Sequence, residues 1–87
     1  MTKTTYILIC ESSNESDYTA HSFPTEMAAY TAMNCMIKSH TAAIETTCHI
    51  PPCVEQVSSY KIQLIFNAII AESDMTIKIT YSVYEVK

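Results

Sequence analysis

The alternation of apolar and polar positions predicts four strands around one helix. Residues 5–10, TYILIC, are β-branched and aromatic, which is typical of a buried strand. Residues 18–23, YTAHSF, alternate imperfectly and follow the polar segment 11–17, so we expect a hairpin with the first strand. Residues 75–86 show the clearest alternation of the chain and predict another strand.

Residues 60–71, YKIQLIFNAIIA, are compatible with either a strand or a helix. Alternation and β-branched content favour the strand, with Lys61, Gln63 and Asn67 facing outward. The preceding segment 46–59 contains Pro51 and Pro52 and is interpreted as a stiff connector, because paired prolines end a helix and force extended backbone before them.

A long helix is predicted between these two halves. Ser22 and Thr25 are alternative N-caps, and Glu26 would lie at the positive end of the helix dipole. One narrow polar stripe follows the helical repeat: Thr31, Asn34, Lys38, Thr41 and Glu45. Most other residues from 27 to 37 are apolar, so we expect the helix to be covered by the sheet and by a partner chain.

The resulting expectation is a single small α+β domain over residues 1–87, with an antiparallel β-sheet in the order ββαββ. One main helix would pack on one face of that sheet. Apolar residues make up 48% of the chain and charged residues 16%, a composition too apolar for a disordered protein.

The chain contains no glycine and no arginine. Without glycine it lacks the phosphate-binding loops that require backbone with no Cβ. Positive backbone φ angles are expected at Asn or Asp, such as Asn14, Asp17 and Asp74. The net charge of −4 and the absence of a basic patch argue against direct nucleic-acid binding.

No apolar run approaches the roughly 18 residues that span a bilayer, so we expect no membrane partner. The segment at residues 1–10 is interpreted as a strand rather than a signal peptide. Together these features predict a cytoplasmic protein, in the producing or the host cell, with reduced cysteines.

The four cysteines raise three alternatives to simple buried thiols. Cys35, His40, Cys48 and Cys53, with the spacing C-x4-H-x7-C-x4-C, could form a zinc site. A disulfide between Cys48 and Cys53 would need an oxidising compartment. Catalysis by Cys48 would need a histidine positioned beside it, and no glycine is near to form an oxyanion hole. Buried or semi-buried free thiols are the favoured interpretation, with no cofactor and no catalytic residue.

Acidic residues gather in the two predicted turns, at Glu11, Glu15 and Asp17 and at Glu72 and Asp74. We expect these turns at opposite ends of the sheet. The second apolar side of the helix, with Tyr30 and Met33, is a candidate interface for a target or for a homodimer. The predicted partner-binding residues are therefore Glu11, Glu15, Asp17, Tyr30 and Met33.

In size, acidity and lack of catalytic machinery, the chain resembles the accessory proteins that phages and mobile elements make to block a host protein. No specific motif carries this resemblance. It implies a small acidic protein that is not an enzyme and that binds and inhibits another protein, one with a basic surface. The alternative is a small structural module organised by zinc.

Overall fold

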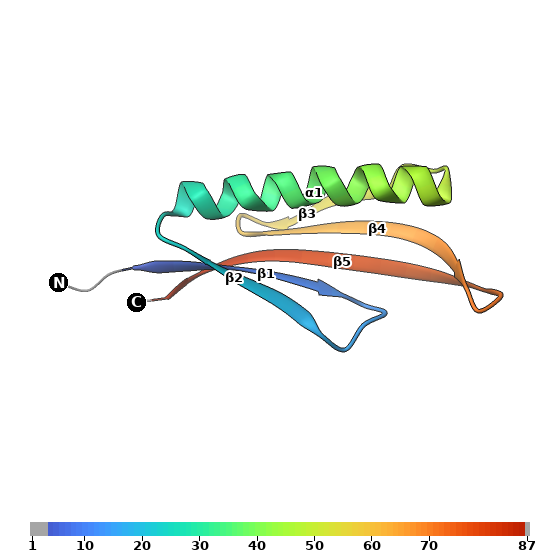
Figure 1. The fold of residues 1–87 in the computed structure, drawn as a ribbon, viewed down its shortest axis with the longest axis horizontal. Helices are drawn as coiled ribbons and strands as arrows, with labels where there is room; N and C mark the ends of the chain where they lie inside the picture. Colours follow the sequence, from blue (N-terminus) through green and yellow to red (C-terminus); the bar gives the residue numbers. More distant parts are fainter. Residues whose placement is uncertain (1–3, 87) are drawn as a thin grey trace.

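The computed structural model describes residues 4–86, which form a five-stranded antiparallel sheet and one helix (Figure 1). The elements are β1 (Thr5–Ser12), β2 (Tyr18–Phe23), α1 (Glu26–Cys48), β3 (Cys53–Ser58), β4 (Lys61–Ile70) and β5 (Ser73–Val86). The strand order in the sheet is β2-β1-β5-β4-β3. The α+β class is confirmed, and the predicted order ββαββ is corrected to ββαβββ.

The additional strand, β3, lies in the segment that the sequence analysis treated as a connector. It forms one edge of the sheet and pairs only with β4. Five of its six residues are exposed, and a register shift between Gln56 and Ser58 interrupts the alternation. An exposed edge strand with a bulge carries no clear period-two signal, which explains why the pattern did not reveal it.

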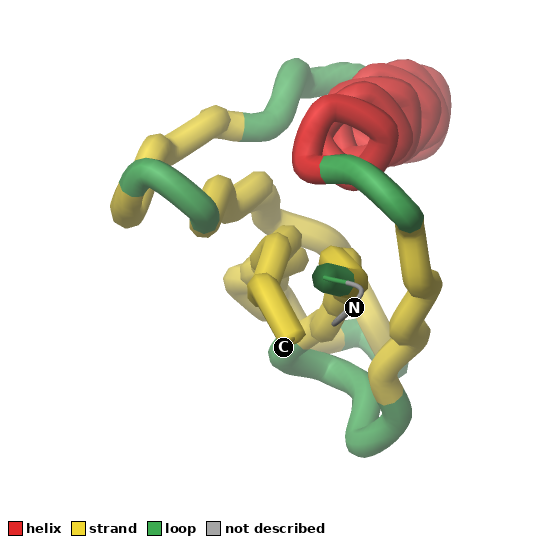
Figure 2. Tube along the Cα trace, turned by 90° about the vertical axis from the view of Figure 1, so that its left-hand side faces the viewer, coloured by secondary structure: helices red, strands yellow, loops and turns green. Residues whose placement is uncertain are grey.

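The core lies where the helix meets the sheet. Directly paired residues of antiparallel strands share a face, and Leu8 pairs with Val83 while Leu64 pairs with Ile79. The buried cluster is Leu8, Ala29, Met33, Ile44, Leu64, Tyr81 and Val83. It joins α1 to β1, β4 and β5, and Figures 1 and 2 show the helix on one side of the twisted strands.

Both ends of the helix have identifiable caps. Thr25 rather than Ser22 is the N-cap, and its Oγ1 accepts a hydrogen bond from the Ala28 N–H at 3.1 Å. At the other end, His49 adopts a left-handed conformation with φ 60°, and its N–H donates to the Glu45 carbonyl at 2.9 Å. The helix therefore extends to Cys48, further than the polar stripe indicated.

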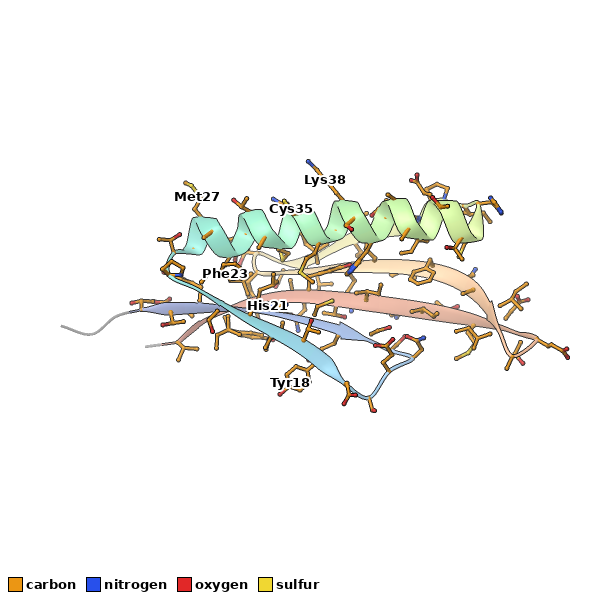
Figure 3. All side chains as sticks on the ribbon, viewed as in Figure 1. Tyr18, His21, Phe23, Met27, Cys35 and Lys38 are labelled. Atoms are coloured by element: carbon orange, nitrogen blue, oxygen red, sulfur yellow. The ribbon has the colours of Figure 1, made fainter. Side chains whose placement is uncertain are left out.

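The outer side of the helix is open in the described chain. Met27, Cys35 and Lys38 point away from the sheet (Figure 3), and Met27 is 80% exposed. That a partner chain covers this side of the helix remains a prediction.

The hairpin of β4 and β5 projects beyond its neighbours. β3 reaches β4 only as far as Ile65, and β1 reaches β5 only as far as Ile79. Within residues 4–86, segments 66–70 and 73–77 therefore pair only with each other, and we call them together the ribbon. It contributes to an elongated molecule of 54 × 22 × 19 Å.

The turn at the tip of the ribbon has an unusual backbone. Ala71 and Glu72 have φ angles of 51° and 67°, and they form the two-residue loop between the paired Ile70 and Ser73. Two consecutive positive φ angles define a type I′ hairpin turn. The expectation that Asn14, Asp17 or Asp74 would adopt positive φ was wrong: among the described residues, His49, Ala71 and Glu72 do.

Candidate functional site

The two acidic turns lie at the same end of the sheet, which corrects the expected opposite placement. β1 and β4 both run antiparallel to the central strand β5, so they point in the same direction. The turn after β1 therefore lies beside β5, where the Ser13 N–H donates to the Lys78 carbonyl at 2.9 Å. The turn after β4 lies beyond it, at the tip of the ribbon (Figure 1).

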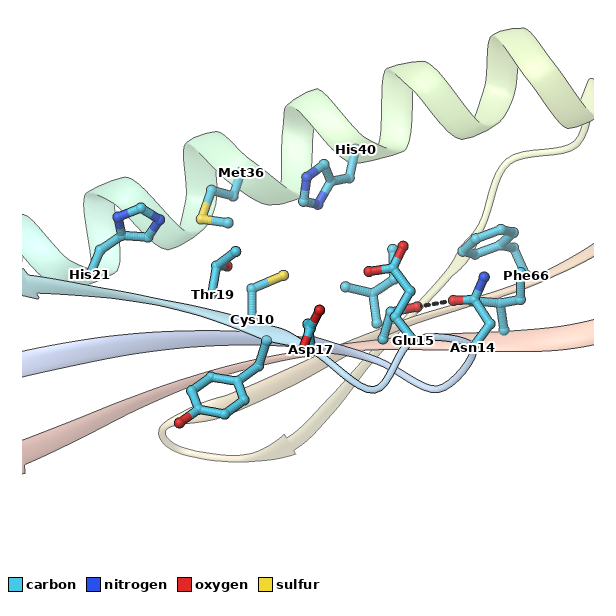
Figure 4. A pocket seen from close by; sticks show the side chains of 13 residues that line it. Cys10, Asn14, Glu15, Asp17, Thr19, His21, Met36, His40 and Phe66 are labelled. Carbon is cyan, nitrogen blue, oxygen red and sulfur yellow. Dashed lines mark hydrogen bonds between the residues drawn. The ribbon is translucent and has the colours of Figure 1, made fainter.

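A cavity of about 510 Å³ opens beside these turns, and we call it the acidic cleft. The helix forms one wall, the β1–β2 hairpin a second, and the base of the ribbon a third (Figure 4). Its lining residues are Cys10, Ser12, Asn14, Glu15, Asp17, Tyr18, Thr19, His21, Met36, His40, Phe66, Ile77 and Ile79.

The cleft combines apolar and acidic groups. Its apolar lining includes Met36 from the helix and Phe66 from the ribbon, with Ile77, which is only 4% exposed. Glu15 and Asp17 supply carboxylates from the β1–β2 turn, where both are exposed. Among the described residues that line the cleft there is no lysine, so the fixed charges at its rim are negative.

A hydrogen bond fixes the histidine on the helix wall. The Nδ1 atom of His40 lies 2.5 Å from the hydroxyl of Tyr81, and the two ring centroids are 5.7 Å apart. Burial, and secondarily the negative charge of Cys10 once its thiol has ionised at high pH, raises the pKa of Tyr81 above its ordinary value. The phenol thus stays protonated, and the contact holds the His40 ring at the cleft wall without creating a phenolate.

The Cys10 thiol also stays protonated at neutral pH. Burial is the main reason why its pKa is raised, and the carboxylates of Glu15 and Glu11 act in the same direction. A hydrogen bond with Thr19 opposes them. Because the thiolate is the reactive form, Cys10 is a poor nucleophile here.

The residues predicted to bind a partner are only partly brought together. Glu15 and Asp17 line the cleft. Glu11 pairs with Thr80 and lies on the sheet face opposite the helix-facing residues. Tyr30 lines a smaller hollow at the other end of the molecule. Met33 is 2% exposed in the core, so we remove it from the candidate surface.

The predicted zinc ligands are not gathered. Cys35 is exposed on the outer side of the helix (Figure 3), whereas His40 faces the cleft. Cys53 is exposed on the edge strand β3. Within residues 4–86, no three His, Cys, Asp or Glu side chains are placed so that they could hold a metal ion.

His21, Phe66 and Ile77 were not recognised as site residues from the sequence, and His40 was considered only as a zinc ligand. The strand register places His21 on the same face as Phe23, since both pair with helix-facing residues of β1. The pattern within β2 can indicate which face of the strand carries His21. It cannot show that the helix forms the opposite wall of the cleft.

Comparison of the chain with protein-family models, curated proteins and solved structures finds no match. No helix in the described part of the chain has the length and apolar character needed to cross a membrane.

Proposed function

We propose that the protein binds another protein through the acidic cleft and the adjoining ribbon, and inhibits it by covering a basic surface. One observation carries this proposal: an apolar cavity of about 510 Å³ with carboxylates at its rim and no lysine among its described lining residues. The partner segment that fits has apolar side chains flanked by lysine or arginine.

The ribbon extends the apolar surface of the cleft. Phe66 and Ile77 at its base line the cleft, and Ile70 and Met75 follow on the same face at alternate positions of their strands. Ile70 is 38% exposed and Met75 is 40% exposed. Apolar side chains that continue outward from a cavity form a surface that gains free energy when a partner covers it.

Charge supports the same partner chemistry. Glu72 and Asp74 at the tip of the ribbon are exposed, as are Glu15 and Asp17 at the rim of the cleft. In a chain with a net charge of −4, this concentration of carboxylates attracts a basic surface and speeds its encounter. Burial of the apolar side chains then supplies the affinity.

The mechanism requires no chemistry on the partner. The protonated Cys10 and the hydrogen-bonded His40 serve as parts of the wall. We place the protein with the accessory inhibitors of phages and mobile elements, acting in the cytoplasm of the producing or host cell. This assignment rests on size, acidity and the cleft.

Site-specific photo-crosslinking in host cells tests the proposal. A benzophenone amino acid at Ile70, on the apolar face of the ribbon near its tip, should crosslink a discrete partner. The same group at Met27, on the outer side of the helix, is the matched control and should not. Equal crosslinking at both positions would contradict the proposed surface.

The captured partner then allows a quantitative test. The double variant Glu15→Gln, Asp17→Asn should weaken binding by about tenfold and reduce its salt dependence, since each exposed charge contributes about 0.5–1 kcal/mol. Glu55→Gln, an exposed carboxylate on the edge strand β3, is the control and should leave affinity unchanged. Unchanged affinity in the double variant would refute the electrostatic part of the mechanism.

A further inference from the structure

The strand β2 forms one edge of the sheet, and among the described residues it pairs only with β1. Five of its six residues are exposed. Natural proteins usually shield such an edge with lysine, proline or a bulge. The sequence of β2, YTAHSF, contains neither lysine nor proline, and its register with β1 runs without a shift from Tyr18 to Phe23. This edge is therefore an open template for a further strand.

The opposite edge of the sheet, β3, is not equivalent. A register shift between Gln56 and Ser58 interrupts its ladder with β4. The side-chain amide of Gln56 donates to the backbone carbonyls of Ser58 and Lys61, and Glu55 adds a charge. A bulge and a charged side chain both hinder the addition of a strand, so β2 is the edge that favours it.

The hydrogen bonds of β1 show which backbone groups of β2 are open. In antiparallel sheets, successive residues direct their N–H and C=O groups alternately to the two sides of the strand. The Ser13 N–H donates to the Lys78 carbonyl, so Ser13 and every second residue before it on β1 face β5. The residues of β1 between them face β2, where they pair with Thr19, His21 and Phe23. The other residues of β2 direct their backbone groups to the open side: Tyr18, Ala20 and Ser22.

The same alternation separates the side chains along this edge. Thr19 and His21 point to the side of the sheet that carries the helix, and both line the acidic cleft (Figure 4). Tyr18 and Ala20 lie on the other face of the strand, and Tyr18 is 65% exposed (Figure 3). A strand added beside β2 would therefore place alternate side chains at the cleft and the remaining ones beside Tyr18.

Charge determines which kind of strand fits. Glu15 and Asp17 directly precede β2, and both are exposed and line the cleft. The chain has no lysine from residue 4 to residue 37, a range that includes β1, β2 and the first turns of α1. A second copy paired antiparallel along β2 would bring these carboxylates near its own Glu26, and like charges disfavour that pairing. A basic strand is favoured instead.

We propose that a basic segment of a partner protein adds to β2 as a further antiparallel strand of the sheet. The proposal rests on the proposed function and specifies how the partner is recognised. Antiparallel pairing continues the arrangement of the sheet and is the more stable per residue. Lysine or arginine at alternate positions of the segment faces the cleft beside Glu15 and Asp17, and apolar residues between them cover Tyr18. Backbone hydrogen bonds supply affinity, and the alternate side chains supply specificity.

A capped heptapeptide of alternating lysine and valine, with lysine at both ends, is the probe. Bound as proposed, it directs its valine N–H groups to β2 and its lysine N–H groups to solvent. In an NMR titration of the full chain, N-methylation of the central valine should weaken binding at least about tenfold. N-methylation of a neighbouring lysine, which gives a peptide of identical composition and charge, should weaken it less than about twofold. Equal weakening by the two modifications, or no saturable binding of the parent peptide, would overturn the proposal.

Proline variants identify the edge that binds. Ala20→Pro removes an N–H that faces away from β1, and edge strands tolerate proline at such a position. It should weaken peptide binding at least about tenfold. Val54→Pro is the matched control on β3 and should leave the affinity unchanged, because Val54 pairs with Leu64, whose backbone groups face β5. Unchanged affinity in folded Ala20→Pro would overturn the proposal. If that variant fails to fold, the methylated peptides decide, since they leave the protein unaltered.

Two outcomes separate this proposal from the proposed function. If Glu15→Gln, Asp17→Asn weakens peptide binding but the two methylated peptides bind alike, the cleft attracts a basic segment without strand addition, and only the present proposal fails. If valine methylation abolishes binding and the double variant has no effect, strand addition stands and the electrostatic part of the proposed function fails. A dimer in light scattering that Ala20→Pro converts to a monomer would identify a second copy as the added strand and overturn the proposal.

Discussion

Ala71 at the tip of the ribbon should be replaceable by glycine with a gain in stability. Its φ angle of 51° lies in the left-handed region. This region is unfavourable by roughly 1–2 kcal/mol for a residue with a Cβ. Glycine removes that strain but adds about 0.5–1 kcal/mol of lost chain entropy on folding. The net expectation is a gain of about 0.5–1 kcal/mol.

Chemical denaturation and thermal melting measure this gain. For a domain of this size, the gain corresponds to a rise in melting temperature of roughly 2–8 °C. Ala71→Asn should behave similarly, because asparagine tolerates the left-handed region and adds no glycine entropy. Neither substitution changes the net charge, so electrostatic effects do not enter the comparison.

The matched control is Ala43→Gly, at an exposed position in the helix. There the backbone is helical, and glycine should destabilise the protein by about 1 kcal/mol. The two substitutions are chemically identical, so only the local backbone conformation separates their effects. If Ala71→Gly lowered stability as much as Ala43→Gly, the turn would not have the positive φ angles described above.

Three further predictions concern the core, the titration of buried groups and metal. Met33→Ala should destabilise the protein by about 2–5 kcal/mol, whereas Met27→Ala should change the free energy of unfolding by less than about 0.5 kcal/mol, as denaturation curves of both will show. Because burial raises the pKa of Tyr81, the unfolded chain releases that phenol proton first, so the contribution of Tyr81 to stability should be complete below about pH 10 and decline above it. Tyr81→Phe should reduce this decline in melts recorded across alkaline pH, and an unchanged decline would contradict the assignment. Chelation of divalent metals should leave the melting temperature unchanged. Loss of structure on chelation, together with stoichiometric bound zinc, would instead support the alternative of a structural module organised by zinc.

Local patterns were sufficient to predict most of the secondary structure. The alternation in residues 60–71 correctly favoured a strand, β4, whose apolar positions Ile62, Leu64 and Phe66 face the core cluster. The N-cap and the acidic first turn were also identifiable from the sequence. These features depend on neighbours along the chain, so a single sequence contains the necessary information.

The site depended on which strands are neighbours in the sheet, and local patterns do not determine this. The added edge strand β3 lets β4 run in the same direction as β1, which brings Glu15 and Glu72 toward one end. The residue pattern alone does not reveal that strand, and without it the two turns are expected at opposite ends of the sheet. Likewise, Phe66 on the ribbon and His40 on the helix line the same cleft because the helix lies beside the base of the ribbon.

Among the described residues of this glycine-free chain, positive φ angles occur at two places with different consequences. At His49, the N–H bond to the Glu45 carbonyl closes the helix and offsets the left-handed conformation. Ala71 and Glu72 close a ribbon beside which no other strand of the described residues is paired. A two-stranded ribbon alone is only marginally stable in water, so strain at its tip lowers the stability of the segment proposed for partner contact.

The stability of the ribbon should also affect partner binding. A partner that binds the ordered ribbon must supply the free energy needed to hold its two strands together. A substitution that stabilises the ribbon in the free protein should therefore strengthen binding by pre-organisation. Slower amide exchange at residues 66–70 and 73–77 in Ala71→Gly, together with tighter partner binding, would connect the strained turn to function. Slower exchange without tighter binding would show that the turn affects stability alone.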